Sequence, residues 1–370
     1  MNALKRLNDF GQSLWYDNIH RRMLENGDLA KMIAEDGLVG ITSNPAIFEK
    51  AIAGSSDYDH KIKEFLEDGG GFSNRDLFFK LAIEDIRQAA DCLKETYERT
   101  QRQDGYVSLE VSPDLAYDAE ATVQEAMSLW KRVDRPNLMI KVPATKACLP
   151  AVEQLIANGV NVNVTLLFSV ERYQEVVNAY LSGLRQRHRQ GLPVDHVASV
   201  ASFFVSRVDT SVDKILEDKG ITDAALLGQA AIANAKLAYK HYLQIFDGIE
   251  FSELKGAGAV VQRLLWASTG VKNPAYRDVL YIESLIGPNT VTTVPPATYD
   301  AFRDHGEVDE TLTAMEGVEL LLEAVQNQGV DLDVVTTELE KQGVDLFAKA
   351  FENLLAAIQQ KADILSGVSA

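Results

Sequence analysis

Short apolar or alternating segments, each followed by a stretch of helical periodicity, recur along the 370-residue chain. This alternation is typical of repeated βα units. Eight units favour a (β/α)8 barrel of the TIM type over an open doubly wound sheet. We predict strands at residues 13–17, 38–44, 106–111, 137–142, 160–165, 197–203, 264–268 and 289–294, with helices at 75–102, 115–131, 170–189 and 223–246.

The spacing of these units indicates additions to the barrel within a single domain, residues 1–370. We expect a helical insertion at about residues 46–104, with Asp-Gly-Gly-Gly at 68–71 forming a turn. We also expect C-terminal helices at about 308–365 that pack over the barrel. A Rossmann sheet would need a glycine-rich phosphate fingerprint after its first strand, and Gly-Ala-Gly at 256–258 lacks that context.

Charge and composition exclude several classes of partner. A net charge of −18 argues against nucleic acid or an anionic membrane surface, so an anionic ligand must be held by local basic groups. We see no secretory signal and no apolar run approaching the ~20 residues of a membrane span. Cys92 and Cys148 cannot form a disulfide framework, and no histidine shows the spacing of a metal site or a hydrolase triad. We expect a cytoplasmic protein without a metal.

Lys141 lies in the apolar segment Asn-Leu-Met-Ile-Lys-Val-Pro at residues 137–143. Burying a lysine costs free energy unless the fold pairs or uses it. Burial disfavours the ammonium form, and the free amine is a nucleophile for carbonyl carbon. Two interpretations follow: a lysine that forms a Schiff base, or a strand-end lysine that reaches out to water.

Polar residues gather at the predicted carboxyl ends of the strands, where barrel enzymes place their active sites. Because residues two apart share a face of a strand, each polar set should point into the barrel. The residues concerned are Asp17, Asn44, Ser108, Glu110, Lys141, Asn161, Asn163, Thr165, Ser202 and Ser268. A carboxylate in an apolar strand needs a partner or a purpose, and Lys141 on the neighbouring strand could supply both to Glu110.

Each of these residues also has a structural interpretation. Asn44 before Pro45 could initiate a turn, and Asp17 could cap a helix that begins near Ile19. Glu110 and Lys141 could form a purely structural pair.

Together these segments resemble the transaldolase family, over roughly residues 10–300, and the long form resembles a bacterial subgroup of it. The resemblance rests on Ser-Leu-Trp-Tyr-Asp at 13–17, Thr-Ser-Asn-Pro at 42–45, the strand with Glu110, Ile-Lys-Val-Pro-Ala-Thr at 140–145, Asn-Val-Asn-Val-Thr-Leu-Leu-Phe-Ser at 161–169, Ser-Phe-Phe-Val-Ser-Arg-Val-Asp at 202–209 and Trp-Ala-Ser-Thr-Gly at 266–270.

The resemblance implies a class I mechanism without metal or organic cofactor. Lys141 would attack C2 of a ketose phosphate and form an iminium, the electron sink for carbon–carbon cleavage. Asp17 would take the proton of the C4 hydroxyl, while Glu110 and Thr165 would hold the water that relays protons.

The resemblance also implies the substrate-binding residues. Asn44, Asn163 and Ser202 would bind the hydroxyls of the dihydroxyacetone unit. Thr42, Phe204 and Ser268 would complete the site, and Arg207 would hold the phosphate. Many relatives carry a second phosphate arginine two residues after the serine that matches Ser268; here Gly270 stands there, and Lys272 could replace it as a point charge.

The implied activity is transfer of a dihydroxyacetone unit between sugar phosphates in the non-oxidative pentose phosphate pathway. Sedoheptulose 7-phosphate or fructose 6-phosphate would donate it to glyceraldehyde 3-phosphate or erythrose 4-phosphate. A class I fructose-6-phosphate aldolase that releases free dihydroxyacetone is the alternative enzyme, but such relatives are shorter and tend to carry tyrosine at Phe204. A non-catalytic sugar-phosphate binding protein is the alternative from another class. A monomer and a homodimer both stay open.

Overall fold

The computed structural model describes residues 2–67 and 73–366, and parallel strands form a closed barrel within it. The order around the barrel follows the chain, with β1 paired to both β2 and β8. The predicted (β/α)8 fold is therefore confirmed. The strands are β1 (Gln12–Tyr16), β2 (Gly40–Ile41), β3 (Tyr106–Glu110), β4 (Leu138–Pro143), β5 (Val162–Leu167), β6 (Ser199–Phe204), β7 (Arg263–Ala267) and β8 (Thr290–Val294).

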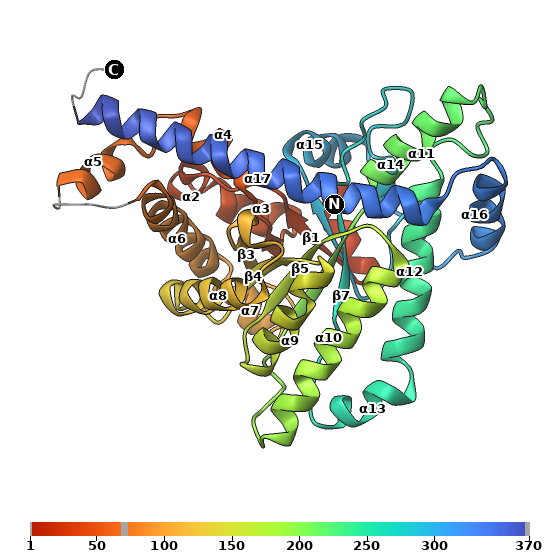
Figure 1. The fold of residues 1–370 in the computed structure, drawn as a ribbon, viewed down its shortest axis with the longest axis horizontal. Coiled ribbons are helices and arrows are strands. Elements are labelled where there is room, and N and C mark those ends of the chain that lie inside the picture. The colour runs from red at the N-terminus through yellow and green to blue at the C-terminus, as the bar shows by residue number, and fades with distance from the viewer. Residues whose placement is uncertain (1, 68–72, 367–370) are drawn as a thin grey trace.

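Helices surround the barrel (Figure 1), and the apolar core lies largely between them and the strands. The first half contains α1 (Ala3–Arg6), η1 (Leu7–Phe10), α2 (Arg21–Glu25), α3 (Asp28–Asp36), α4 (Pro45–Ala53), α5 (Asp59–Glu67), α6 (Asn74–Cys92), α7 (Lys94–Arg99), η2 (Pro113–Leu115), α8 (Ala119–Val133), η3 (Lys146–Cys148) and α9 (Leu149–Ala157). The second half contains α10 (Val170–Arg189), α11 (Ser206–Asp218), α12 (Ala230–Phe246), α13 (Ile249–Gly256), α14 (Leu280–Glu283), α15 (Pro296–His305), α16 (Val318–Asn327) and α17 (Leu332–Leu365).

The second strand is much shorter than its apolar pattern predicted. The prediction was 38–44, whereas β2 contains Gly40–Ile41 alone. The chain leaves the sheet early because Asn44 already serves as the N-cap of α4: its side chain accepts a hydrogen bond from the Ile47 N–H, and Pro45 follows at the first helical position.

Three predicted helices also differ from those observed. The predicted helix 115–131 is observed as Ala119–Val133, because the Asp118 side chain caps it by accepting from the Ala121 N–H. The stretch 75–102 contains two helices, α6 and α7, which meet at the buried Leu93. The predicted helix 223–246 begins later, at Ala230. Asp223 caps a turn by accepting from the Ala225 N–H, and Gly228 has a φ of 69° in the left-handed region, which interrupts a helix.

The predicted insertion contains α4, α5, α6 and α7, which follow β2 and precede β3. A buried polar cluster ties it to the barrel. Arg21 on α2 donates to the Asp85 carboxylate on α6, and the Tyr58 hydroxyl donates to the other oxygen of Asp85. The predicted turn at 68–71 lies outside the described residues.

The C-terminal region was predicted to be helical from residue 308 to 365, and the structure corrects its beginning. Residues 306–317 are not helical, and α16 starts at Val318. The long helix α17, drawn in blue, crosses above the barrel strands in Figure 1. It packs against α4, α5, α6, α11 and β5. The expected packing of this region over the barrel is thus present in α17.

Candidate active site

A cavity of about 370 Å³ opens at the carboxyl ends of the strands. This is the face at which (β/α)8 enzymes place their catalytic residues. Ten of the residues predicted from the sequence line it: Asp17, Thr42, Asn44, Lys141, Thr165, Ser202, Phe204, Arg207, Ser268 and Lys272. Two further predicted residues, Glu110 and Asn163, are buried beside this lining.

Lys141 and Glu110 meet because the register of β3 and β4 places them opposite each other. The Lys141 Nζ lies 3.2 Å from Glu110 Oε2 and donates a 3.2 Å hydrogen bond to the Ser43 carbonyl. The two residues are only 4% and 7% exposed. Lys141 therefore does not reach out to water, and that interpretation was wrong. The ion pair leaves Glu110 Oε2 without an aligned hydrogen-bond donor among the described residues.

The environment of Glu110 favours its protonated form. Burial raises the pKa of its carboxyl to about 7, the nearby Lys141 ammonium lowers it in part, and the negative charge of Asp17 raises it again. A carboxyl with a pKa near neutrality can both give and take a proton at physiological pH.

Asp17 follows β1 and faces the cavity. Its Oδ1 accepts a 2.7 Å hydrogen bond from the Thr42 hydroxyl, which is itself 2.6 Å from the Thr293 hydroxyl. The suggestion that Asp17 caps a helix near Ile19 was wrong. The helix begins at Arg21 instead, and the His20 side chain caps it by accepting from the Met23 N–H.

A chain of buried hydrogen bonds crosses the barrel interior below the cavity. The Ser202 hydroxyl donates to Asn163 Oδ1 at 2.6 Å, and the Asn163 amide donates to the Ser108 hydroxyl at 3.0 Å. Thr165 lies on the same strand, two residues closer to its carboxyl end than Asn163. Its buried hydroxyl has no hydrogen-bond partner within residues 2–67 and 73–366, so it is available to a ligand.

Two of the predicted residues that line the cavity are basic. Arg207, in the first turn of α11, has its guanidinium carbon 5.6 Å from the centre of the Phe204 ring. Lys272 lies in the loop after β7, with its Nζ 3.8 Å from where a Cβ at Gly270 would stand. Neither cation has an ion-pair partner in the described part of the chain. Both can therefore take an anionic group.

Ser268 directly follows β7 and lines the same cavity. Its φ of 55° lies in the left-handed region, and its hydroxyl is 2.9 Å from that of Ser206. Strained backbone conformations of this kind persist where the surrounding structure holds them and occur often at functional sites.

Sequence reasoning missed several residues that line the cavity. Thr293 is the last residue but one of β8, within an alternating threonine–valine strand, a pattern that could have suggested it. Lys50, on α4, is one of many exposed lysines in the chain, so nothing in the sequence distinguishes it. Phe347 lies on α17, and its position in an amphipathic helix is indistinguishable from that of an ordinary core residue.

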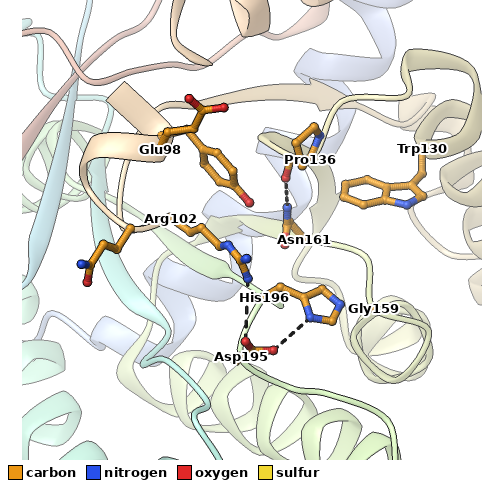
Figure 2. A pocket seen from close by; sticks show the side chains of 10 residues that line it. Glu98, Arg102, Trp130, Pro136, Gly159, Asn161, Asp195 and His196 are labelled. Carbon is orange, nitrogen blue, oxygen red and sulfur yellow. Dashed lines mark hydrogen bonds and ion pairs between the residues drawn. The ribbon is translucent and has the colours of Figure 1, made fainter. Parts of the chain in front are cut away.

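A larger cavity, of about 940 Å³, lies at the opposite end of the barrel, and none of the residues predicted to act in catalysis or substrate binding lines it (Figure 2). Its lining includes Pro136 and Asn161, which precede β4 and β5. The basic groups there are already engaged, because Asp195 lies 3.8 Å from Arg102 and 3.2 Å from His196. We therefore place the active site at the carboxyl-end cavity.

No group of three or more His, Cys, Asp or Glu side chains in the described residues is arranged to hold a metal ion. Among the helices described, none has the length and apolar character needed to cross a membrane.

Comparison with known proteins identifies the family. A profile described as Transaldolase/Fructose-6-phosphate aldolase matches residues 14–358. The chain belongs to this family. A protein of Saccharopolyspora erythraea named Transaldolase is 47% identical over 97% of this chain and 98% of its own length. One of Nostoc punctiforme named Transaldolase 2 is 46% identical over 99% of both chains, and one of Thermobifida fusca named Transaldolase is 47% identical over 97% and 98%.

The transaldolase family assignment confirms the resemblance seen in the sequence, and the chain is an enzyme of this transferase family. The matched segments span nearly the whole chain, at 97% and 99% coverage.

Replacing Glu110 by glutamine should change how the free energy of unfolding of this transaldolase-family enzyme depends on pH. The carboxyl has a pKa of about 7 in the folded chain, against an ordinary value of 4.5. Between these values the folded state binds more protons than the unfolded state, so wild-type stability falls as pH rises. Between pH 4.5 and 7.5, the free energy of unfolding of the wild type should therefore fall by up to about 3 kcal/mol more than that of Glu110→Gln.

Urea unfolding of both proteins at several pH values measures this difference. Glu98→Gln, which removes an exposed carboxylate in a loose pair with Lys94, serves as the control and should leave the profile unchanged. If Glu110→Gln and the wild type have parallel profiles, the carboxyl does not titrate near neutrality.

Proposed function

We propose that the chain transfers a dihydroxyacetone unit between sugar phosphates through a Schiff base on Lys141. The donor is fructose 6-phosphate or sedoheptulose 7-phosphate, and the acceptor is glyceraldehyde 3-phosphate or erythrose 4-phosphate, as in the non-oxidative pentose phosphate pathway. One observation carries the proposal. A buried lysine beside a carboxyl that titrates near neutrality lies in a cavity with unpaired cations.

The first step joins Lys141 to the donor. Its free amine attacks C2 of the ketose, and the resulting carbinolamine loses water to give a protonated imine. This step needs a group that takes a proton from nitrogen and gives one to the departing hydroxyl. Glu110 is 3.2 Å from the Lys141 nitrogen, and the unpartnered hydroxyl of Thr165 can hold the water that connects them to the substrate.

The second step breaks the C3–C4 bond. Asp17 takes the proton of the C4 hydroxyl, the C3–C4 electron pair moves toward the iminium, and an aldose phosphate leaves. The hydrogen bond from Thr42 orients the Asp17 carboxylate for this transfer. Asn44 and Ser202 bind hydroxyls of the retained three-carbon unit, and Asn163 Oδ1 holds Ser202 in place by accepting a hydrogen bond from its hydroxyl.

The third step forms a new bond. The enamine carbon of the retained unit attacks the aldehyde carbon of the acceptor, and the aldehyde oxygen recovers a proton. Addition of one water to the imine then releases the new ketose phosphate and the free lysine. The names of the relatives support transfer rather than simple cleavage, and so does Phe204, which offers no hydroxyl to protonate the enamine.

The phosphate end of the substrate pairs with Arg207, Lys272 and Ser268. An arginine can donate two parallel hydrogen bonds to a phosphate, whereas a lysine contributes a single mobile charge. The position of Lys272 next to Gly270 supports its role as replacement for the missing arginine. Lys50, which lines the same cavity, adds a third positive charge.

Borohydride trapping with fructose 6-phosphate tests the Schiff base. We expect a three-carbon adduct on the peptide that contains Lys141, located by mass spectrometry, and no adduct in Lys141→Ala. The matched control is Lys146→Ala. The Lys146 side chain is 81% exposed to solvent and does not line the cavity, so its removal should leave trapping intact. An adduct on Lys146 alone contradicts the proposal.

The role of Asp17 is tested by Asp17→Asn, which keeps the shape of the side chain and an oxygen that can accept from Thr42. Imine formation should persist, while carbon–carbon cleavage should slow by ~10²–10⁴-fold because the proton acceptor is lost. Trapping and glyceraldehyde 3-phosphate release are measured in parallel. Asp9→Asn, on an exposed carboxylate, is the control. Near-normal cleavage by Asp17→Asn would assign the proton transfer to another group.

Arg207→Ala tests the phosphate contact. Loss of charge-assisted hydrogen bonds worth ~1.5–3 kcal/mol should raise KM for fructose 6-phosphate by roughly ten- to a hundred-fold. Activity on unphosphorylated fructose should hardly change. Lys272→Ala should show the same pattern more weakly, because it removes only a point charge. Equal losses on both substrates would mean that Arg207 supports the fold and that the phosphate binds elsewhere.

A further inference from the structure

The helix α17 holds a fixed position across the mouth of the barrel (Figure 1). It contains 34 residues, roughly 50 Å of helix, and is anchored on both sides of its middle. Near one end Glu340 accepts a 3.0 Å hydrogen bond from Arg172 on α10. Near the other end Lys361 pairs with Asp59 and donates a 2.7 Å hydrogen bond to the Ser55 carbonyl.

The middle of α17 approaches the barrel unusually closely. A Cβ placed on Gly343 would stand 2.9 Å from Cδ2 of Leu166, so a larger residue would force either the Leu166 side chain or the helix to shift. Leu166 itself lies where the register of β5 and β6 shifts, with a φ of 64°. The strand thus bends under the helix. The bend and the glycine together bring α17 down onto the carboxyl end of β5.

One turn after Gly343, Phe347 points into the cavity. Its ring centre lies 5.4 Å from the Lys141 Nζ, and the residue is only 8% exposed. It lines the same cavity as Asp17 and Ser202. Because Phe347 has no polar side-chain atom, it can exclude water but cannot relay a proton. It therefore shields the Lys141 nitrogen, and any group bound to it, on the side facing α17.

Exclusion of water matters most after cleavage, when the three-carbon unit is an enamine on Lys141. In transfer, its carbon forms a bond to the acceptor aldehyde, and the aldehyde oxygen takes a proton. In release, the same carbon takes a proton that originates from water, and the restored imine adds one water to give free dihydroxyacetone and lysine. Both routes end with hydrolysis of an imine. They differ only in whether the enamine carbon meets an aldehyde or a proton.

We propose that Phe347 sets the ratio of transfer to release by keeping bulk water from the enamine on Lys141. This inference rests on the proposed Schiff-base function and adds a specificity-determining residue to it. The anchors of α17 and the contact of Gly343 with Leu166 hold the ring in place, so the cover is built into the fold.

Phe347→Ala tests the proposal by opening the cavity to water on the α17 side. We expect the rate of glyceraldehyde 3-phosphate release from fructose 6-phosphate without acceptor, divided by the rate of transfer to erythrose 4-phosphate, to rise about tenfold or more. A ratio is the informative quantity, because a general loss of stability lowers both rates alike. Phe347→Leu retains an apolar side chain and should raise the ratio less.

Phe351→Ala is the matched control: it removes the same ring from the same helix, one turn later. Phe351 packs 5.7 Å from Phe78 and under the Arg75 guanidinium, outside the cavity. Its ratio should equal that of the wild type. If Phe347→Ala does not fold, Phe347→Leu is measured in its place. A release-to-transfer ratio for Phe347→Leu equal to that for Phe351→Ala would overturn the proposal.

The Schiff base on Lys141 and the role of Phe347 are tested by different outcomes. If borohydride traps no adduct on Lys141 in the wild type, the proposed function is wrong. If the adduct forms in the wild type and in both Phe347 variants while the ratio stays constant, only the role of Phe347 is wrong. A rise in the ratio for Phe351→Ala as large as for Phe347→Ala also overturns that role, because it would show a general effect of disturbing α17.

Discussion

The buried pair of Lys141 and Glu110 is the interaction on which the organisation of the site depends. Taking two charged groups out of water costs several kcal/mol each, and their attraction repays this only in a favourable geometry. Parallel pairing of β3 and β4 supplies that geometry by placing the two residues opposite each other. Burial at the same time keeps the pKa of Glu110 high, near 7. A purely structural role would explain the ion pair itself. It would not explain the unpartnered Thr165 hydroxyl beside the pair, which indicates room for a ligand.

The cavity carries positively charged side chains although the chain as a whole is negatively charged. With a net charge of −18, the long-range field does not attract a phosphate. Arg207, Lys272 and Lys50 compensate at short range, since none of them forms an ion pair within the described residues. At the other end of the barrel, by contrast, Arg102 and His196 share the carboxylate of Asp195. The distribution of paired and unpaired cations thus separates the two ends of the barrel more clearly than cavity size does.

Much of the fold could be predicted because repeated βα units produce a strong periodic signal, and α10 (Val170–Arg189) matches its prediction at both ends. Boundaries were less predictable where a local interaction competes with periodicity. Asn44 ends β2 by capping α4, and Gly228 delays α12, although neither changes the apolar pattern. The polar residues at strand ends could be found for a related reason. A carboxylate or lysine in an apolar strand is conspicuous, whereas an exposed lysine such as Lys50 and an apolar residue of an amphipathic helix such as Phe347 are not.

The sequence by itself determined the barrel, the family and the residues that each strand carries to its carboxyl end, because these follow from short-range patterns and from motifs contiguous in the chain. Only the tertiary structure decided which of those side chains meet. Register placed Glu110 against Lys141, and closure of the barrel brought Thr293 of β8 to Thr42 after β2. The close passage of α17 put Phe347 over the lysine. Such contacts join residues far apart in the chain, and no local propensity encodes them; they arise when packing selects one arrangement of the whole.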